Sequence, residues 1–159
     1  MTLRYEHTDD PHDQIFYVIR TLITFKSVPW ILVLITSGLV ELLLNQLIRF
    51  RCRNHKRILK SNREYPLSVK IVLLHETKVI SDELFYDLEW FRKLRNEAAH
   101  NPFFVLDRNA LKRFKRRKYQ NPHHFNLVCV QLITDIMLTD PKIFIKQFPK
   151  FKEILEPPA

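Results

Sequence analysis

A single glycine, Gly38, occurs in this chain of 159 residues. β-Sheets joined by tight turns usually need several glycines, because the favoured hairpin turns have positive φ angles. Hydrophobic residues make up 46% of the sequence, which is enough to build a core and argues against a disordered chain. The composition therefore predicts an all-α fold, and the length predicts a single domain over residues 1–159 with its core at about residues 12–150.

Capping residues and prolines mark the places where helices are expected to begin. These starts are Asp10-Pro11, Ser27–Pro29, Pro66-Leu67, Ser81-Asp82, Asn121-Pro122 and Asp140-Pro141. Apolar residues recur at helical spacing between them, so we expect a bundle of about five to six helices. Pro102 disfavours helical backbone at Asn101, and the helix that begins at Ser81 is therefore expected to end with His100 in its last turn.

The segment Val28–Ile48 is long and apolar enough to cross a membrane. It is interrupted by Glu41, Asn45 and Gln46, and a carboxylate is costly in lipid. We therefore interpret the segment as the central helix of a bundle, with no membrane partner, and keep a membrane-associated adaptor as the less favoured alternative. Met1–Pro11 has neither the cationic start nor the apolar run of a signal peptide, so a cytoplasmic location is expected.

The chain has a formal net charge of +9, which bears on its partners rather than on its fold. One basic cluster consists of Arg49, Arg51, Arg53, Lys56, Arg57 and Lys60. The second consists of Arg108, Lys112, Arg113, Lys115, Arg116, Arg117 and Lys118, beside Phe114 and Tyr119. Cations interleaved with aromatic rings suit single-stranded RNA, which offers phosphates and stackable bases. A solvated face, or a docking site for an acidic protein, would have the same composition.

The end of the helix that begins at Ser81 carries residues suited to phosphodiester chemistry. Asn96 and His100 are four residues apart and share a helix face, which Arg92 joins one turn earlier. Arg95 lies about 140° from His100 around an ideal helix, but its side chain is long enough to swing toward the imidazole. A permanent cation, an amide and a group that titrates near pH 7 can bind a phosphodiester and transfer its protons. The pattern is short, however, and a histidine at a helix end is often a cap or a packing residue.

Glu41 is a lone carboxylate in an apolar helix and needs a polar partner. We expect it to contact Arg95 or His100 and to orient them, and a structural salt bridge with another arginine is the alternative. The two cysteines, Cys52 and Cys129, form no CxxC pattern, which favours free thiols in a reducing compartment. No other cluster has the spacing of metal ligands, so neither a metal nor a cofactor is expected.

Five stretches carry a resemblance to a known family, and they are Pro66–Leu74, Ile80–Leu84, Leu88–His100, Leu39–Leu44 and Asp140–Phe144. Across residues 27–148 the chain resembles the HEPN superfamily, and within it the mannitol-operon-repressor-like branch. The resemblance implies a HEPN-like helical bundle that forms a homodimer through the helices bearing the motif. Many HEPN proteins are metal-independent ribonucleases of toxin, antiphage and RNA-processing systems.

The Arg-polar-(x)n-His motif of that family corresponds to Arg95, Asn96 and His100. The resemblance implies that His100 is the acid or base, Arg95 the phosphate ligand and Asn96 the residue that positions them. The implied activity is endoribonuclease cleavage of RNA, with 2′,3′-cyclic phosphate and 5′-hydroxyl ends and possible control by an antitoxin. Pro102 occupies the place where related toxins often carry a tyrosine that is modified to silence them. The same branch includes members regarded as non-catalytic regulators that bind a protein or nucleic acid, and this is the alternative function.

Overall fold

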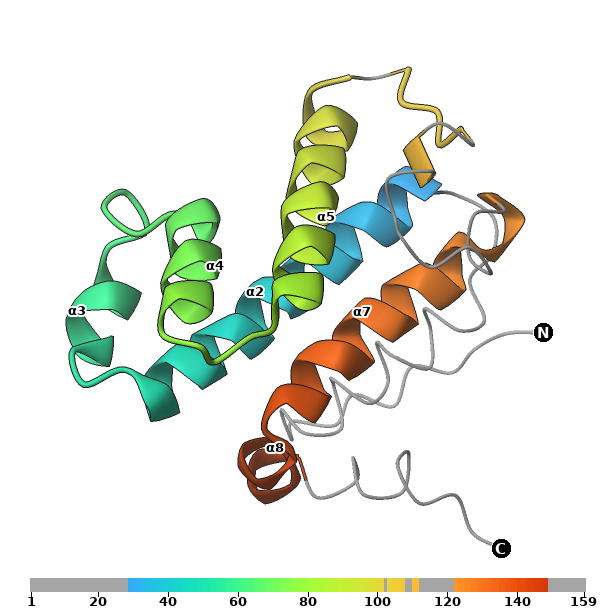
Figure 1. The fold of residues 1–159 in the computed structure, drawn as a ribbon. Coiled ribbons are helices and arrows are strands. Elements are labelled where there is room, and N and C mark those ends of the chain that lie inside the picture. Colours follow the sequence, from blue (N-terminus) through green and yellow to red (C-terminus); the bar gives the residue numbers. More distant parts are fainter. Residues whose placement is uncertain (1–28, 102, 108–109, 112–121, 149–159) are drawn as a thin grey trace, which may run out of the picture.

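The described residues of the computed structural model are 29–101, 103–107, 110–111 and 122–148, and they form helices without any strand (Figure 1). The helices are α2 (Pro29–Arg51), α3 (His55–Lys60), α4 (Leu67–Glu76), α5 (Asp82–His100), the 3-10 turn η2 (Pro122–His124), α7 (Phe125–Thr139) and α8 (Pro141–Gln147). The prediction of an all-α bundle is therefore confirmed. The helix predicted to begin at Asp10-Pro11 lies outside the described residues.

The long helix α2 lies at the centre of this bundle, with α7 and α5 packed along it and α3 and α4 near its end (Figure 1). Its side chains Leu43, Leu44 and Leu47 are completely buried. In the part of the chain that the structure describes, α2 is the one helix long and apolar enough to span a membrane, and half of its most apolar stretch is buried inside the protein. Core helices of soluble proteins share this property.

Helix α5 begins and ends where the sequence predicts. The hydroxyl oxygen of Ser81 accepts a hydrogen bond from the backbone N–H of Leu84 at 3.3 Å, and Asp82 lies in the first turn, where a negative charge is favourable. After His100 the backbone of Asn101 becomes extended, with φ −110° and ψ 105°. The motif is therefore in the last turn of a capped helix.

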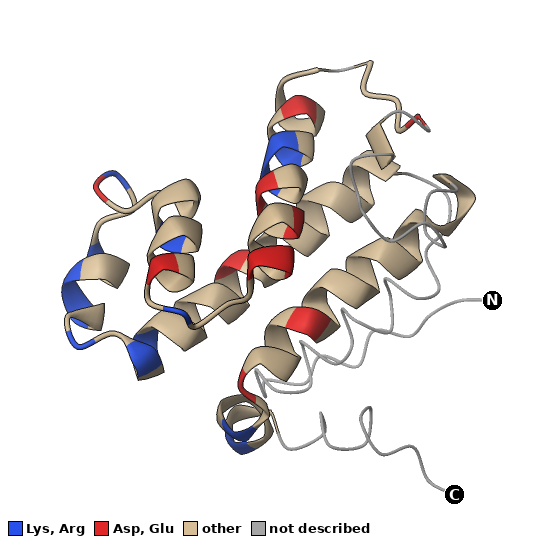
Figure 2. Ribbon diagram, viewed as in Figure 1, with Lys and Arg blue, Asp and Glu red and all other residues tan. Residues whose placement is uncertain are grey.

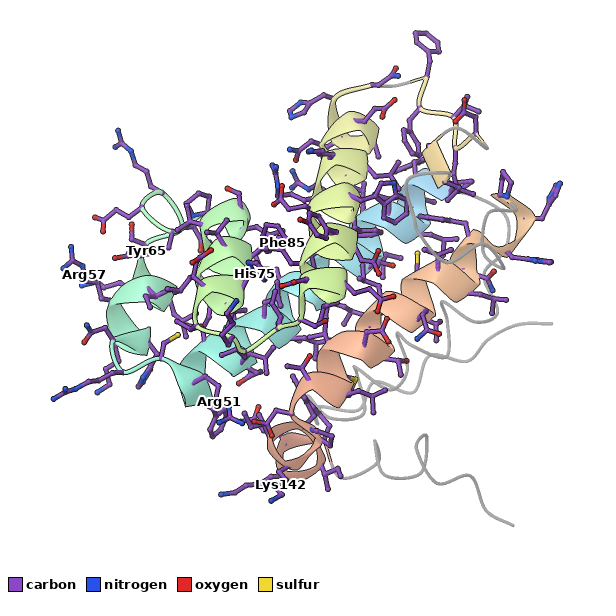
Figure 3. The ribbon with its side chains drawn as sticks, in the orientation of Figure 1. Arg51, Arg57, Tyr65, His75, Phe85 and Lys142 are labelled. Carbon is purple, nitrogen blue, oxygen red and sulfur yellow. The ribbon has the colours of Figure 1, made fainter. Side chains whose placement is uncertain are left out.

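The short helix α3 was not predicted, since residues 49–60 were interpreted only as a basic cluster. Ile58 is 7% exposed and attaches α3 to the core, while the neighbouring cations Lys56 and Arg57 remain exposed. Figure 2 shows Lys and Arg gathered along this part of the chain. Arg51, at the end of α2, forms an ion pair with Asp140, which also caps α8 by accepting from the N–H of Ile143 (Figure 3).

The turn between α4 and α5 is held by His75. Its ring stacks on Phe85 with 4.3 Å between centroids, and its Nε2 lies 2.8 Å from Oδ1 of Asp82 (Figure 3). This hydrogen bond, together with the charge of the imidazole, lowers the pKa of Asp82 below its usual value of 3.8.

A lowered pKa in the folded state means that Asp82 stabilises the fold above the carboxyl's ordinary pKa, and that this contribution is lost as the pH falls through the lowered pKa. We expect the His75→Gln variant to raise the pKa of Asp82 back toward 3.8, because the charge of the imidazole is removed. NMR titration of the Asp82 carboxyl in both proteins measures the change. Equal pKa values in the two proteins would contradict the assigned cause.

Candidate functional site

The solvent side of the last turns of α5 carries the predicted motif. One face of this helix buries Leu84, Leu88, Phe91 and Leu94 in the core. Burial of that face leaves Arg95, Asn96 and His100 exposed at the opposite side, near the end of the helix. All three motif residues are thus open to solvent in the last turns of α5.

Arg95 and Asn96 are in direct contact, since Nη1 of Arg95 donates a hydrogen bond to Oδ1 of Asn96 at 3.3 Å. His100 lies one turn beyond Asn96, and within the described part of the chain its imidazole makes no hydrogen bond or ion pair. Lys93 is two turns before His100 and adds a second exposed cation to the same face. The surface therefore combines positive charge with an imidazole that is open to solvent.

Arg92 does not reach these residues. Its guanidinium forms two parallel hydrogen bonds with Glu89, from Nε to Oε1 and from Nη2 to Oε2, both at 3.0 Å. The hydrogen bonds to this carboxylate raise the pKa of Arg92. Arg92 was predicted to support Asn96 and His100, but its side chain is directed back along α5 by Glu89, which is a well-oriented bidentate partner.

The expectation that Glu41 contacts Arg95 or His100 is wrong. Oε1 of Glu41 lies 3.4 Å from Nζ of Lys70 on α4, and the same Nζ lies 3.1 Å from Oδ1 of Asn62. The side chain of Lys70 is only 1% exposed, so its ammonium group needs acceptors from the protein. Glu41 therefore acts as the counter-ion of a buried lysine. This is the structural salt bridge that was the alternative, but its partner is a lysine and not an arginine.

The second basic cluster, which was predicted to bind RNA, falls outside the described residues: Arg108, Lys112, Arg113, Lys115, Arg116, Arg117 and Lys118. Two residues between them are described. Leu111 is completely buried, and the carbonyl oxygen of Ala110 accepts a hydrogen bond from Nε1 of Trp90 at 2.8 Å. Ala110 is thus attached to α5, the helix that carries the motif.

Sequence reasoning missed the loop that follows His100. Phe103 is 85% exposed and Val105 is 76% exposed, whereas Leu106 is buried. The available signal was an apolar run directly after the motif. A sequence pattern of this kind cannot tell which of its members face water, because that depends on how the loop meets the helices.

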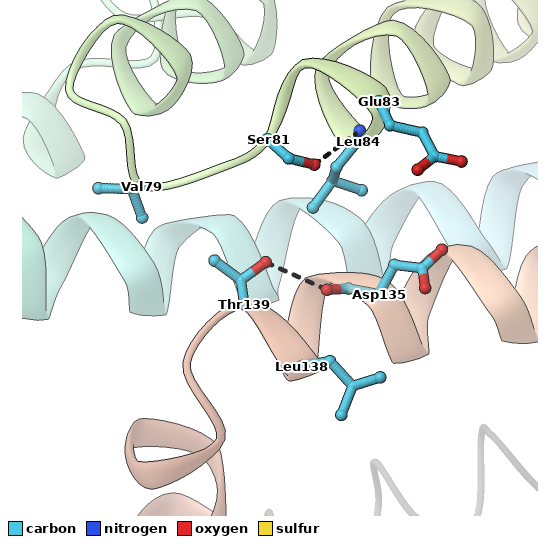
Figure 4. Close-up of a pocket in the computed structure, with 7 residues that line it drawn as sticks. All are labelled: Val79, Ser81, Glu83, Leu84, Asp135, Leu138 and Thr139. Carbon is cyan, nitrogen blue, oxygen red and sulfur yellow. Dashed lines mark hydrogen bonds between the residues drawn. The ribbon is translucent and has the colours of Figure 1, made fainter.

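Other candidate sites have weaker support. A pocket of about 390 Å³ between the α4–α5 turn and the end of α7 is lined by Val79, Ser81, Glu83, Leu84, Asp135, Leu138 and Thr139 (Figure 4). It lies at the start of α5, about 25 Å along the helix from His100 at 1.5 Å per residue. Cys129 is fully buried, which raises its pKa to about 12 and makes its thiol a poor nucleophile. No group of three possible metal ligands occurs among the described residues.

No protein-family model, curated protein or solved structure matches this chain. The chemistry of the site on α5 must therefore be inferred from its own residues. These are a cation hydrogen-bonded to an amide, and an accessible imidazole one turn away.

Proposed function

We propose that this protein is a metal-independent endoribonuclease of the HEPN type. The observation that carries the proposal is the exposed trio at the end of α5, in which Arg95 is hydrogen-bonded to Asn96 and His100 is accessible. The basic character of the whole chain, with a net charge of +9, supports RNA as the partner. A toxin or an antiphage-defence effector, with an antitoxin or another acidic protein as its inhibitor, is the biological role that such an activity would fit.

The proposed reaction transfers the phosphodiester within RNA. A base removes the proton of a 2′-hydroxyl, the 2′-oxygen attacks the adjacent phosphorus, and an acid gives a proton to the departing 5′-oxygen. The products are a 2′,3′-cyclic phosphate and a 5′-hydroxyl. Arg95 stabilises the negative charge that develops on the phosphoryl oxygens, and Asn96 holds the guanidinium in place. His100 moves the protons, because an imidazole can both accept and donate near neutral pH.

A single chain supplies one such imidazole, whereas the reaction needs an acid and a base. Two chains that face each other through α5 would supply both. The exposed stripe of α5 includes Tyr86, which is 56% exposed, and the neighbouring helix α4 exposes Val69 and Val72 at 40% and 45%. A second copy packed along α4 and α5 would cover these side chains. The active form in this proposal is therefore a homodimer.

Incubation of the purified protein with total RNA in EDTA tests the proposal. We expect cleavage, because proton transfer and charge stabilisation are both supplied by side chains. The new 3′ ends should resist ligation until the terminal phosphate is removed to leave a free 3′-hydroxyl, and light scattering of the same sample should give the mass of two chains. Intact RNA after incubation with the well-folded protein would favour the alternative, a HEPN-like regulator that binds without cleaving.

A further inference from the structure

The loop after His100 holds the two most exposed large hydrophobic side chains in the described part of the molecule, Phe103 and Val105. Scattered apolar residues on a surface are common and need no explanation. These two differ in their position, since Phe103 follows His100 by only three residues. Figure 1 shows the loop leaving the end of α5 at the edge of the molecule.

The backbone at Phe103 is fixed on its N-terminal side. Oδ1 of Asn101 accepts a hydrogen bond from the N–H of Phe103 at 2.9 Å, and the carbonyl of Asn101 accepts from the N–H of Phe104 at 3.0 Å. These bonds define a turn organised by the asparagine side chain. Phe104 packs against the core, so the residue next to Phe103 is held against the body of the protein.

The loop is also fixed on its C-terminal side. Leu106 is 6% exposed and belongs to the core. Oδ1 of Asp107 accepts a hydrogen bond from the N–H of Ala110 at 2.7 Å. The carbonyl oxygen of Ala110 in turn accepts a hydrogen bond from Nε1 of Trp90 on α5. Phe103 thus lies between a hydrogen bond to Asn101 and the buried Leu106, and fixing these residues would cost little on binding.

We propose that Phe103 is a stacking platform for a base of the RNA whose phosphate lies at Arg95 and His100. The proposal rests on the proposed function and adds the contact that holds a nucleotide beside the scissile phosphate. The backbone from His100 to Phe103 can span at most about 11 Å, even if its three residues are fully extended. This length equals about three stacked nucleotides at 3.4 Å each, so one short RNA segment could reach both residues. An aromatic face accepts any base, so this contact would strengthen binding without selecting a sequence.

Single-stranded RNA suits this surface better than a protein partner does. The ring follows directly after a helix end that carries Lys93 and Arg95, both exposed. A strand that places its phosphate on these cations has its bases free to stack, whereas a protein would need a larger continuous apolar area to bind stably. Docking of a protein on the loop would instead depend on Val105 as much as on Phe103.

The test measures binding rather than cleavage. A short single-stranded RNA with 2′-O-methyl groups cannot be cleaved, because its 2′-oxygen has no proton to lose. Its affinity for wild type, Phe103→Leu, Phe103→Trp and Val105→Ala is measured by fluorescence anisotropy. Loss of one base stack is worth about 1–3 kcal/mol, so we expect Phe103→Leu to bind about 5- to 150-fold more weakly. Phe103→Trp should bind at least as tightly as wild type, and Val105→Ala should bind equally well.

Equal affinity of Phe103→Leu and wild type would overturn the stacking proposal, even if wild type cleaves RNA. Heparin has negative charge but no bases. If Phe103→Leu weakened heparin binding as much as RNA binding, the stacking proposal would be overturned as well. Equal weakening by Val105→Ala would overturn the stacking proposal too, because it would show a general apolar docking loop. If Phe103→Leu weakens binding but wild type leaves natural RNA intact, the stacking contact stands and the ribonuclease proposal fails.

Discussion

The His100→Ala variant is expected to lose RNA cleavage by a factor of about 10²–10⁴, the contribution that a positioned acid or base usually makes. If one imidazole acts as the base and its copy in the second chain acts as the acid, the substitution removes both at once, and the loss should lie at the upper end. Cleavage of a labelled RNA in EDTA, followed over time, measures the rate. His100 is exposed, so the substitution removes no packing and the thermal stability should remain that of wild type.

His124→Ala is the matched control for this experiment. His124 is also an exposed histidine, but it precedes α7 and lies outside the motif. We expect this variant to cleave at the wild-type rate. A His100→Ala protein that cleaves as fast as wild type would contradict the assigned role and would trace the activity to another residue or to a contaminant.

The Glu41→Ala variant is expected to lower the free energy of unfolding by about 2–4 kcal/mol. The physical reason is the unequal exposure of the pair, because the Lys70 side chain is 1% exposed while that of Glu41 is 40% exposed. Removal of Glu41 leaves a buried ammonium with Asn62 as its remaining acceptor. Urea denaturation followed by circular dichroism measures the loss.

The reverse substitution should behave differently. Lys70→Met leaves Glu41 partly hydrated and fills the buried site with an apolar chain of similar length, so the stability should stay within about 1.5 kcal/mol of wild type. The double variant Glu41→Ala/Lys70→Met should therefore be more stable than Glu41→Ala alone. Strictly additive losses would show that the two side chains do not interact. Glu97→Ala, at an exposed position of α5, is the control and should change stability by less than about 0.5 kcal/mol.

Local signals were sufficient to predict most of the helix boundaries. Ser81 caps α5, Asn101 ends it, and Asp140 caps α8, because each of these effects depends on residues within one turn. The exposure of Arg95, Asn96 and His100 also followed from the sequence, since the apolar residues of the same helix had to face the core.

The partners of individual polar side chains could not be predicted in the same way. Arg92 was expected to join the motif, but Glu89 was an equally near neighbour on the same helix and offered a bidentate partner. Spacing along a helix gives several candidates for each long side chain, and the sequence does not rank them. The short helix α3 escaped prediction for a related reason, because only the packing of Ile58 against α2 distinguishes it from an exposed basic loop.

The sequence by itself determined that this protein is helical, where several of its helices begin and end, and which face of α5 meets water. These properties depend on backbone propensity and on the period of the apolar residues, and both act over a few neighbouring positions. The tertiary structure alone decided that Glu41 serves Lys70 rather than the motif and that the ring of Phe103, three residues after His100, stands in solvent. Such contacts join residues distant in sequence or depend on how a loop crosses the core. They form only when the helices have packed, so a local sequence pattern does not predict them.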